Sequence, residues 1–102
     1  MVEEKFKKLG LELAKLYDAA YEIYKKDVDN IIDNKIVDVH YIEHTLDNCL
    51  GIYTEKGFDL FLKLVFYYST VNLECSYAYI DILKEQRKEE YDDYVKKLEK
   101  KK

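Results

Sequence analysis

The strongest constraint on the fold is an apolar segment at residues 58–68, with the sequence FDLFLKLVFYY. Only Asp59 and Lys63 are charged in this segment, and its apolar side chains would project from almost every side of a helix. A helix that is apolar on nearly all sides must be enclosed by other elements. The segment therefore predicts a buried, central helix. It indicates little about chemistry, because its residues are core residues first.

The composition agrees with a helical globule. The chain has 102 residues, of which 48% are hydrophobic, with three glycines and no proline. The hydrophobic content is too high for a disordered chain, and the lack of proline and glycine removes the usual turn signals of all-β folds. A chain of this length suits one domain with one core. We expect an all-α fold, a compact bundle of about four helices in a single domain spanning residues 1–102.

Hydrophobic periodicity places the four helices. Steps of three and four between apolar residues predict a long first helix over residues 3–33 and a shorter second helix over 36–50. The apolar segment gives a third helix over about 58–70. A long fourth helix follows from residue 73, with Asn72 as its N-cap. The two long helices would enclose the two shorter ones.

The ends of the long helices extend beyond what a small core can cover. The fourth helix loses its apolar stripe at residues 86–88, and its basic end, residues 96–102, is expected to fray. Apolar residues on the overhanging ends would favour self-association, which leaves a homodimer open. The stripe of the first helix consists of Phe6, Leu9, Leu13, Leu16, Ala20, Tyr24, Val28 and Ile31.

The sequence gives three indications about cellular location and redox state. Residues 1–10 are charged and lack the apolar core of a secretory signal, so a cytoplasmic protein is expected. The apolar segment is shorter than the roughly 20 residues that span a bilayer, so we expect no membrane segment. Cys49 and Cys75 lie in predicted helices and are interpreted as reduced packing residues.

One short motif suggests metal chemistry. His40, Glu43 and His44 form H-x-x-E-H, the helical signature of a group of zinc proteases in which two histidines bind zinc and the glutamate activates water. A catalytic zinc needs a third protein ligand, and nothing singles one out among Glu74, Glu85 and Glu89. A zinc-dependent hydrolase is therefore kept as an alternative. Because no other catalytic set appears, we expect a non-enzymatic protein with no metal and no cofactor.

The negative charge is concentrated in the middle of the chain. The net charge is −4, but residues 27–59 carry eight acids against two lysines, for −6, while each flanking part carries +1. An acidic surface of this kind attracts a basic partner, although many charged faces serve only solubility. The residues predicted to bind the partner are Asp33, Asp38, Tyr41, Glu43, Asp47 and Tyr53.

Direct binding to nucleic acid is disfavoured by the acidic net charge, because duplex binding needs a basic face. The lysines of residues 96–102 keep one alternative open, a small dimeric regulator that binds DNA. In the main interpretation these lysines favour the end of a helix and solubilise the chain.

Residues 41–85 resemble small uncharacterised helical proteins of phages and mobile elements in low-GC Gram-positive bacteria. The resemblance rests on an I-E-x-x-L-D helix, an aromatic-ended L-F-x-K-L-x-x-Y-Y helix and an Asn-capped helix containing Ala-Tyr. It implies that the chain binds a host or defence protein with a basic surface, as an anti-CRISPR-like counter-defence inhibitor would. Its acidic segment would then imitate nucleic-acid phosphates. The residues concerned are Ile42, Glu43, Leu46 and Asp47, then Leu60 to Tyr68, then Asn72, Ala78 and Tyr79.

Overall fold

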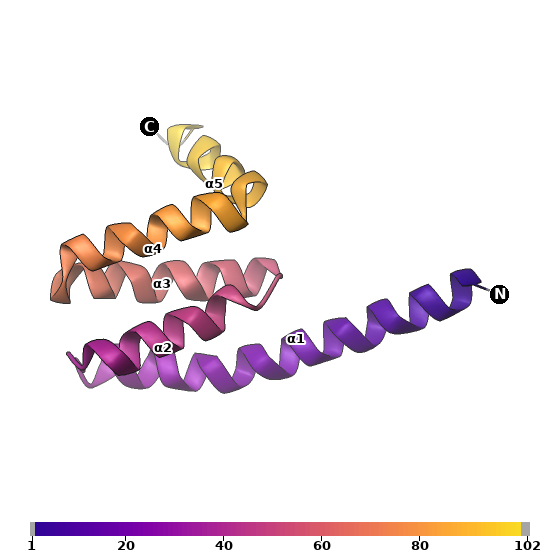
Figure 1. Cartoon of the computed structure of the whole chain (residues 1–102), viewed down its shortest axis with the longest axis horizontal. Helices are drawn as coiled ribbons and strands as arrows, with labels where there is room; N and C mark the ends of the chain where they lie inside the picture. The colour runs from indigo at the N-terminus through magenta and orange to yellow at the C-terminus, as the bar shows by residue number, and fades with distance from the viewer. Residues whose placement is uncertain (1, 101–102) are drawn as a thin grey trace. The chain divides into compact units, whose positions relative to one another are not determined.

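The computed structural model describes residues 2–100 and contains five α-helices (Figure 1). The all-α class is confirmed, and the expected count of about four helices is wrong. The chain divides into two compact units, Met1–Leu64 and Val65–Lys102, each of which is described by itself. The packing of all the helices into one bundle and one domain stays a prediction. The helices are α1 (Val2–Asp33), α2 (Val39–Leu50), α3 (Glu55–Val71), α4 (Leu73–Gln86) and α5 (Lys88–Lys100).

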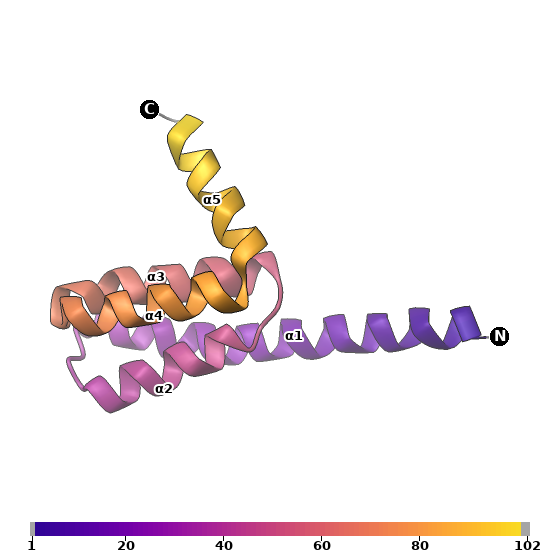
Figure 2. The same cartoon turned by 45° about the horizontal axis from the view of Figure 1, so that its top comes forward.

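In the first unit, α2 lies beside the second half of α1 (Figures 1 and 2). The Tyr41 hydroxyl donates a hydrogen bond across this contact to Asp27 Oδ1 at 3.0 Å. The part of α3 that belongs to this unit is tied to α1 by an ion pair of 3.2 Å between Lys63 and Asp29. The two bonds fix α1 against both of the helices that follow it.

The core of the first unit is built from all three of its helices. Val28 and Ile31 come from α1, and both are fully buried. Because α3 is apolar on most sides, it contributes side chains at consecutive positions rather than along a single stripe. The buried residues of α2, the following loop and this part of α3 are Ile42, Leu46, Cys49, Leu50, Ile52, Phe58, Leu60, Phe61, Leu62 and Leu64.

The turn between α1 and α2 is closed by a Schellman motif. The N–H groups of Lys35 and Ile36 donate to the carbonyl oxygens of Ile32 and Ile31, at 3.3 and 2.9 Å. Lys35 takes the left-handed conformation, with a φ of 51°. Asp38 then caps α2, so this helix begins at Val39 and not at residue 36 as the periodicity predicted. The apolar pattern extends back to residue 36 in the turn, so periodicity alone placed the start of the helix too early. The Asp38 cap sets the actual start of α2.

The start of α3 also differs from the prediction, which placed it at residue 58. Thr54 Oγ1 accepts a hydrogen bond of 3.1 Å from the N–H of Gly57, so Thr54 acts as a cap and the helix begins at Glu55. Gly57 is therefore a helical residue. A Cβ at this position would lie 2.3 Å from the backbone oxygen of Ile52. The glycine is needed for a close approach between the first turn of α3 and the preceding loop.

In the second unit, the N-cap expected at Asn72 is confirmed, since its side chain accepts a hydrogen bond of 3.1 Å from the N–H of Cys75. The expected long fourth helix is wrong, because it is broken at Arg87, whose backbone has φ −134° and ψ 50°. The Arg87 side chain is buried and forms an ion pair with Glu90 in the first turns of α5.

α5 includes residues 96–100, and the fraying predicted for this basic end stays a prediction. The remaining part of that prediction, Lys101 and Lys102, lies outside the described residues.

Two groups of apolar residues are exposed, one at the overhanging end expected of the first helix and one that was expected to be buried. Every residue from 3 to 16 in the first half of α1 is exposed. Phe66 is also 54% exposed, although it lies in the apolar segment predicted to be enclosed on all sides. The predicted burial of its neighbours Val65 and Tyr68 is confirmed.

The cysteines are free, as expected. Cys49 is fully buried, and Cys75 is half-buried. Burial, with a smaller effect of the nearby Asp27 carboxylate, raises the pKa of the Cys49 thiol to about 12. Both effects act against the thiolate, which is the reactive form of cysteine.

The first prediction concerns two glycines that are matched by type and differ in surroundings. Gly57→Ala should lower the free energy of unfolding by about 1–3 kcal/mol, because the added methyl group meets the backbone oxygen and the buried side chain of Ile52. Gly10→Ala, at a helical position where a Cβ meets nothing within 4 Å, should stabilise α1 by up to about 1 kcal/mol. Urea unfolding followed by circular dichroism measures both. Equal effects of the two substitutions would contradict the close approach at Gly57.

The second prediction concerns thiol reactivity. At pH 8 a thiol of this pKa is ionised in only about one molecule in 10,000, so Cys49 should not react with an aromatic disulfide reagent until the chain unfolds. The native protein should therefore show one rapid thiol equivalent, which Cys75→Ser removes. Two rapid equivalents in the native protein would show that Cys49 is not enclosed.

A candidate protein-binding surface on α2

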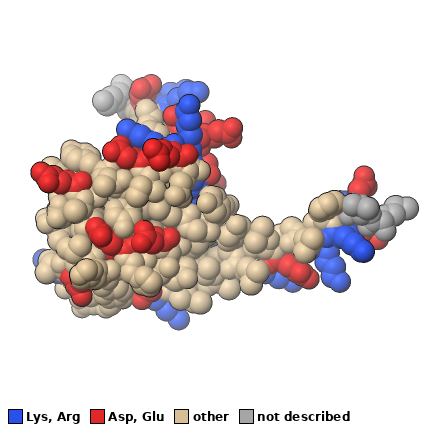
Figure 3. Space-filling view, viewed as in Figure 1, with Lys and Arg blue, Asp and Glu red and all other residues tan. Residues whose placement is uncertain are grey.

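The amphipathic pattern of α2 separates a core face from an outward face. Its buried residues contact the rest of the first unit, while Glu43 and Asp47 share the outward face with His40 and His44 at helical spacing. Acidic side chains lie over α2 in Figure 3, with no basic side chain among them. The helix itself contains no lysine or arginine. Its core face is formed by Ile42, Thr45, Leu46, Cys49 and Leu50.

Two predicted site residues, Glu43 and Asp47, lie on the outward face of α2, and a third, Asp33, lies at the end of α1. Asp47 is exposed, Glu43 is half-buried, and Asp33 is exposed at the end of α1, just before the turn that leads into α2. We call these three residues the α2 acidic face. Asp33 and Asp47 lie in the last turns of α1 and α2, where the helix dipole disfavours negative charge. Glu43 and Asp47 are four residues apart, a spacing at which like charges repel on a helix.

Asp38, a fourth predicted site residue, has a structural role. One of its carboxylate oxygens accepts hydrogen bonds from the N–H groups of His40 at 3.0 Å and Tyr41 at 3.4 Å. These are free N–H groups at the start of α2, and an aspartate is among the best residues to satisfy them. Capping the start of α2 is therefore enough to explain an aspartate at position 38.

The two tyrosines predicted to bind the partner, Tyr41 and Tyr53, differ in how exposed their side chains are. Tyr41 is half-buried, and its hydroxyl group donates to Asp27 and accepts from Asn30 at 3.4 Å. Tyr53 is 55% exposed in the loop after α2, where its ring meets the edge of the Tyr17 ring at 6.4 Å between centroids. Of the two, Tyr53 is the one whose ring a partner can reach.

Two other acids of residues 27–59 interact with groups inside the first unit. A count of charges along the sequence does not show these contacts. Asp27 accepts the hydrogen bond from Tyr41, and Asp29 pairs with Lys25 at 3.1 Å as well as with Lys63. The hydrogen bond from Lys25, assisted by that from Lys63, lowers the pKa of the Asp29 carboxyl group. The acidic surface is thus narrower than the segment from which it was predicted.

The structure does not complete the zinc site suggested by the H-x-x-E-H motif. His40 and His44 are both exposed on α2. Across residues 2–100, no three histidine, cysteine, aspartate or glutamate side chains gather in a way that could hold a metal ion. The described part of the chain therefore supplies no third ligand for this pair.

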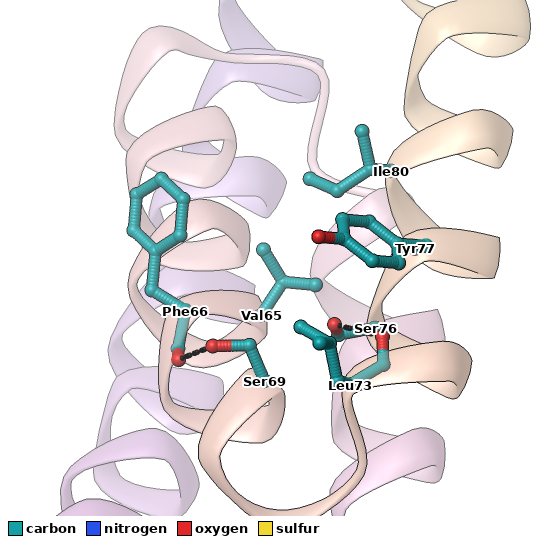
Figure 4. A pocket seen from close by; sticks show the side chains of 7 residues that line it. All are labelled: Val65, Phe66, Ser69, Leu73, Ser76, Tyr77 and Ile80. Atoms are coloured by element: carbon teal, nitrogen blue, oxygen red, sulfur yellow. Dashed lines mark hydrogen bonds between the residues drawn. The ribbon is translucent and has the colours of Figure 1, made fainter.

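The second unit contains an apolar hollow of about 220 Å³ between the end of α3 and α4 (Figure 4). Two of its three hydroxyl groups are engaged, since Ser69 donates to the carbonyl of Phe66 and Ser76 donates to that of Leu73, each at 2.6 Å. The third hydroxyl belongs to Tyr77, whose ring lines the hollow in Figure 4, so the hollow is largely apolar with one further hydroxyl group at its edge. The sequence gives no signal for this hollow, because its lining comes from two separate helices. The lining residues are Val65, Phe66, Ser69, Leu73, Ser76, Tyr77 and Ile80.

Comparisons with protein-family models, with curated proteins and with solved structures found no match to this chain. Within residues 2–100, no helix combines the length and the apolar character needed to cross a bilayer.

The third prediction distinguishes two contributions that Asp38 could make to the stability of the fold, its hydrogen bonds as a helix cap and its negative charge. Asp38→Ala should lower the free energy of unfolding by about 1 kcal/mol, because two N–H groups of α2 lose their acceptor. Asp38→Asn keeps an acceptor oxygen and removes the charge, so it should stay within a few tenths of a kcal/mol of the original chain. Urea unfolding gives both values. A loss for Asp38→Asn as large as that for Asp38→Ala would mean that the charge, and not the cap, carries the contribution.

Proposed function

We propose that this chain is a non-enzymatic helical module that binds a basic surface of a partner protein through the α2 acidic face, Asp33, Glu43 and Asp47. The single observation that carries the proposal is the position of these acids. Asp33 and Asp47 oppose the dipoles of their own helices, and Glu43 and Asp47 repel each other along α2. The fold would be more stable with other residues in place of Asp33 and Asp47, so an interaction outside the fold is the better explanation for these two acids.

The contrast with neighbouring acids supports this interpretation. Asp27, Asp29 and Asp38 each satisfy a donor or a cation within the first unit. Asp33 and Asp47 make no ion pair within residues 2–100 and are exposed to solvent. Opposite charges across an interface increase the association rate and select the partner. The exposed ring of Tyr53 supplies an aromatic anchor of the type that is enriched at interfaces.

For the partner, we propose a protein that handles nucleic acid. The basic channel of such a protein binds phosphates, and closely spaced carboxylates present a similar negative charge. A counter-defence inhibitor of a phage or mobile element, similar to an anti-CRISPR protein, would use this mechanism without catalysis. The alternative of a DNA-binding regulator predicts the opposite dependence, on the lysines at residues 96–100 of α5 and not on the α2 acidic face.

The fourth prediction tests the α2 acidic face with two charge-matched variants. The first is Asp33→Lys, Glu43→Lys and Asp47→Lys. The control, Asp92→Lys, Asp93→Lys and Glu99→Lys, makes the same charge change at exposed positions of α5. Asp38 is left unchanged because its substitution would weaken the helix cap. Each chain is immobilised, used to capture proteins from a lysate of the source cells, and then titrated with the purified captured protein.

We expect the original chain and the control to retain the same basic protein. The α2 variant should bind it at least about 10-fold more weakly, because attractive charge pairs become repulsive. Affinity should also fall as salt is added, since exposed charges are screened. The α2 variant should unfold at an equal or higher urea concentration than the original chain, so a loss of binding would not reflect a loss of folding. Equal binding by both variants, or a DNA complex abolished only by changes in α5, would contradict the proposal.

A further inference from the structure

The first half of α1 carries an apolar stripe that no residue of the first unit covers. Its members are Phe6, Leu9, Leu13 and Leu16, which are 67%, 59%, 48% and 66% exposed. Single exposed apolar residues are normal on a protein surface, but a contiguous row of large ones indicates an interaction site. An isolated helix of about 15 residues is also only marginally stable in water. This half of α1 therefore needs a covering partner that its own unit does not supply.

The spacing of the stripe indicates which kind of surface covers it. Phe6, Leu9, Leu13, Leu16, Ala20 and Ile23 alternate by three and four residues, which is the a and d pattern of a coiled coil. We call these six residues the α1 seam.

Ile23 belongs to the seam and not to the core, because it is 60% exposed while its neighbour Tyr24 is half-buried. The core residues Val28 and Ile31 follow further along the helix. The repeat spans 18 residues, or about 27 Å of helix, and is exposed at every member except Ala20, which is half-buried. This length is enough for several layers of knobs-into-holes packing.

From this geometry we infer that the α1 seam binds the α1 seam of a second copy of the chain, forming an antiparallel two-helix coiled coil. A heptad seam is complementary to another of the same length, and a second copy supplies one directly. The inference is independent of the α2 acidic face, which lies on another helix.

The charge around the seam favours a second copy over other occupants. Residues 3–24 carry five acids and four lysines, so two copies meet without a large net repulsion. A helix that binds an anionic membrane has an excess of lysine or arginine on its polar face, which this segment lacks. A strongly charged protein partner would likewise find no complementary excess here.

The sizes of the seam residues favour the antiparallel direction. Pairing Leu13 with Leu16 of the second copy places Leu9 against Ala20 and Phe6 against Ile23, so that all six positions are paired. A parallel pair in register would place alanine against alanine and phenylalanine against phenylalanine, giving one layer too thin and one too thick. Antiparallel helices also bring opposite ends of their dipoles together.

The fifth prediction uses two leucines that are equally exposed and lie on different faces of α1. Leu16 is in the seam at 66% exposure, and Leu11 lies outside it at 67%. The original chain and Leu11→Glu should have twice the chain mass by sedimentation at sub-millimolar concentration. Leu16→Glu should have the mass of one chain, because a buried carboxylate in the seam is unpaired. Since both leucines are exposed in the single chain, neither change should destabilise the core around Val28 and Ile31, as the midpoint of urea unfolding would verify.

Direction is tested by disulfide formation in air, in a Cys75→Ser background, since Cys49 is enclosed and unreactive. Leu9→Cys chains mixed with Ala20→Cys chains should cross-link to each other faster than either cross-links to itself. Rapid linkage of Leu9→Cys chains to one another would overturn the antiparallel arrangement. A chain that stays monomeric throughout, or binds anionic vesicles as a monomer, would overturn the inference as a whole. So would equal effects of the two glutamate substitutions.

Discussion

The structure depends on the burial of α3, a helix that is apolar around most of its circumference. Within residues 58–68, only a narrow stripe of this helix, at Asp59, Lys63 and Phe66, is exposed, so its other sides must be covered by neighbouring elements. This requirement explains the glycine at position 57, where the first turn of α3 comes so close to Ile52 that even a methyl group does not fit. It also explains why α3 supplies buried residues at consecutive positions, including Phe61, Leu62 and Leu64, instead of a single stripe.

Much of the helical architecture could be predicted from the sequence, because apolar periodicity and caps are local signals. The extent of α1 and the cap at Asn72 were predicted correctly. The starts of α2 and α3 were not, because Asp38 and Thr54 fix them through hydrogen bonds that periodicity does not encode. The break at Arg87 had a weak signal, the gap in the apolar stripe. Sequence alone could not show that Arg87 would be buried and paired with the exposed Glu90.

Residues 27–59 show what a count of charges along the sequence can and cannot say about a binding surface. The count found an excess of acids at residues 27–59, but it treated all of them alike. The structure separates acids with partners inside the fold, Asp27, Asp29 and Asp38, from those in positions that weaken their own helices, such as Asp47. That separation depends on three-dimensional neighbours and on helix ends. The proposed binding site therefore excludes the acids that stabilise the fold. Substituting the remaining acids can then test binding without also unfolding the chain.

We infer that α1 changes role along its length, from a part of the core to a surface that another molecule covers. Hydrogen–deuterium exchange of the unmodified chain across a dilution series tests this claim most directly. We expect the amides of residues 3–16 to become more protected as concentration rises, while those of residues 28–31 stay equally protected throughout. Protection of residues 3–16 that is the same at every concentration would contradict the claim.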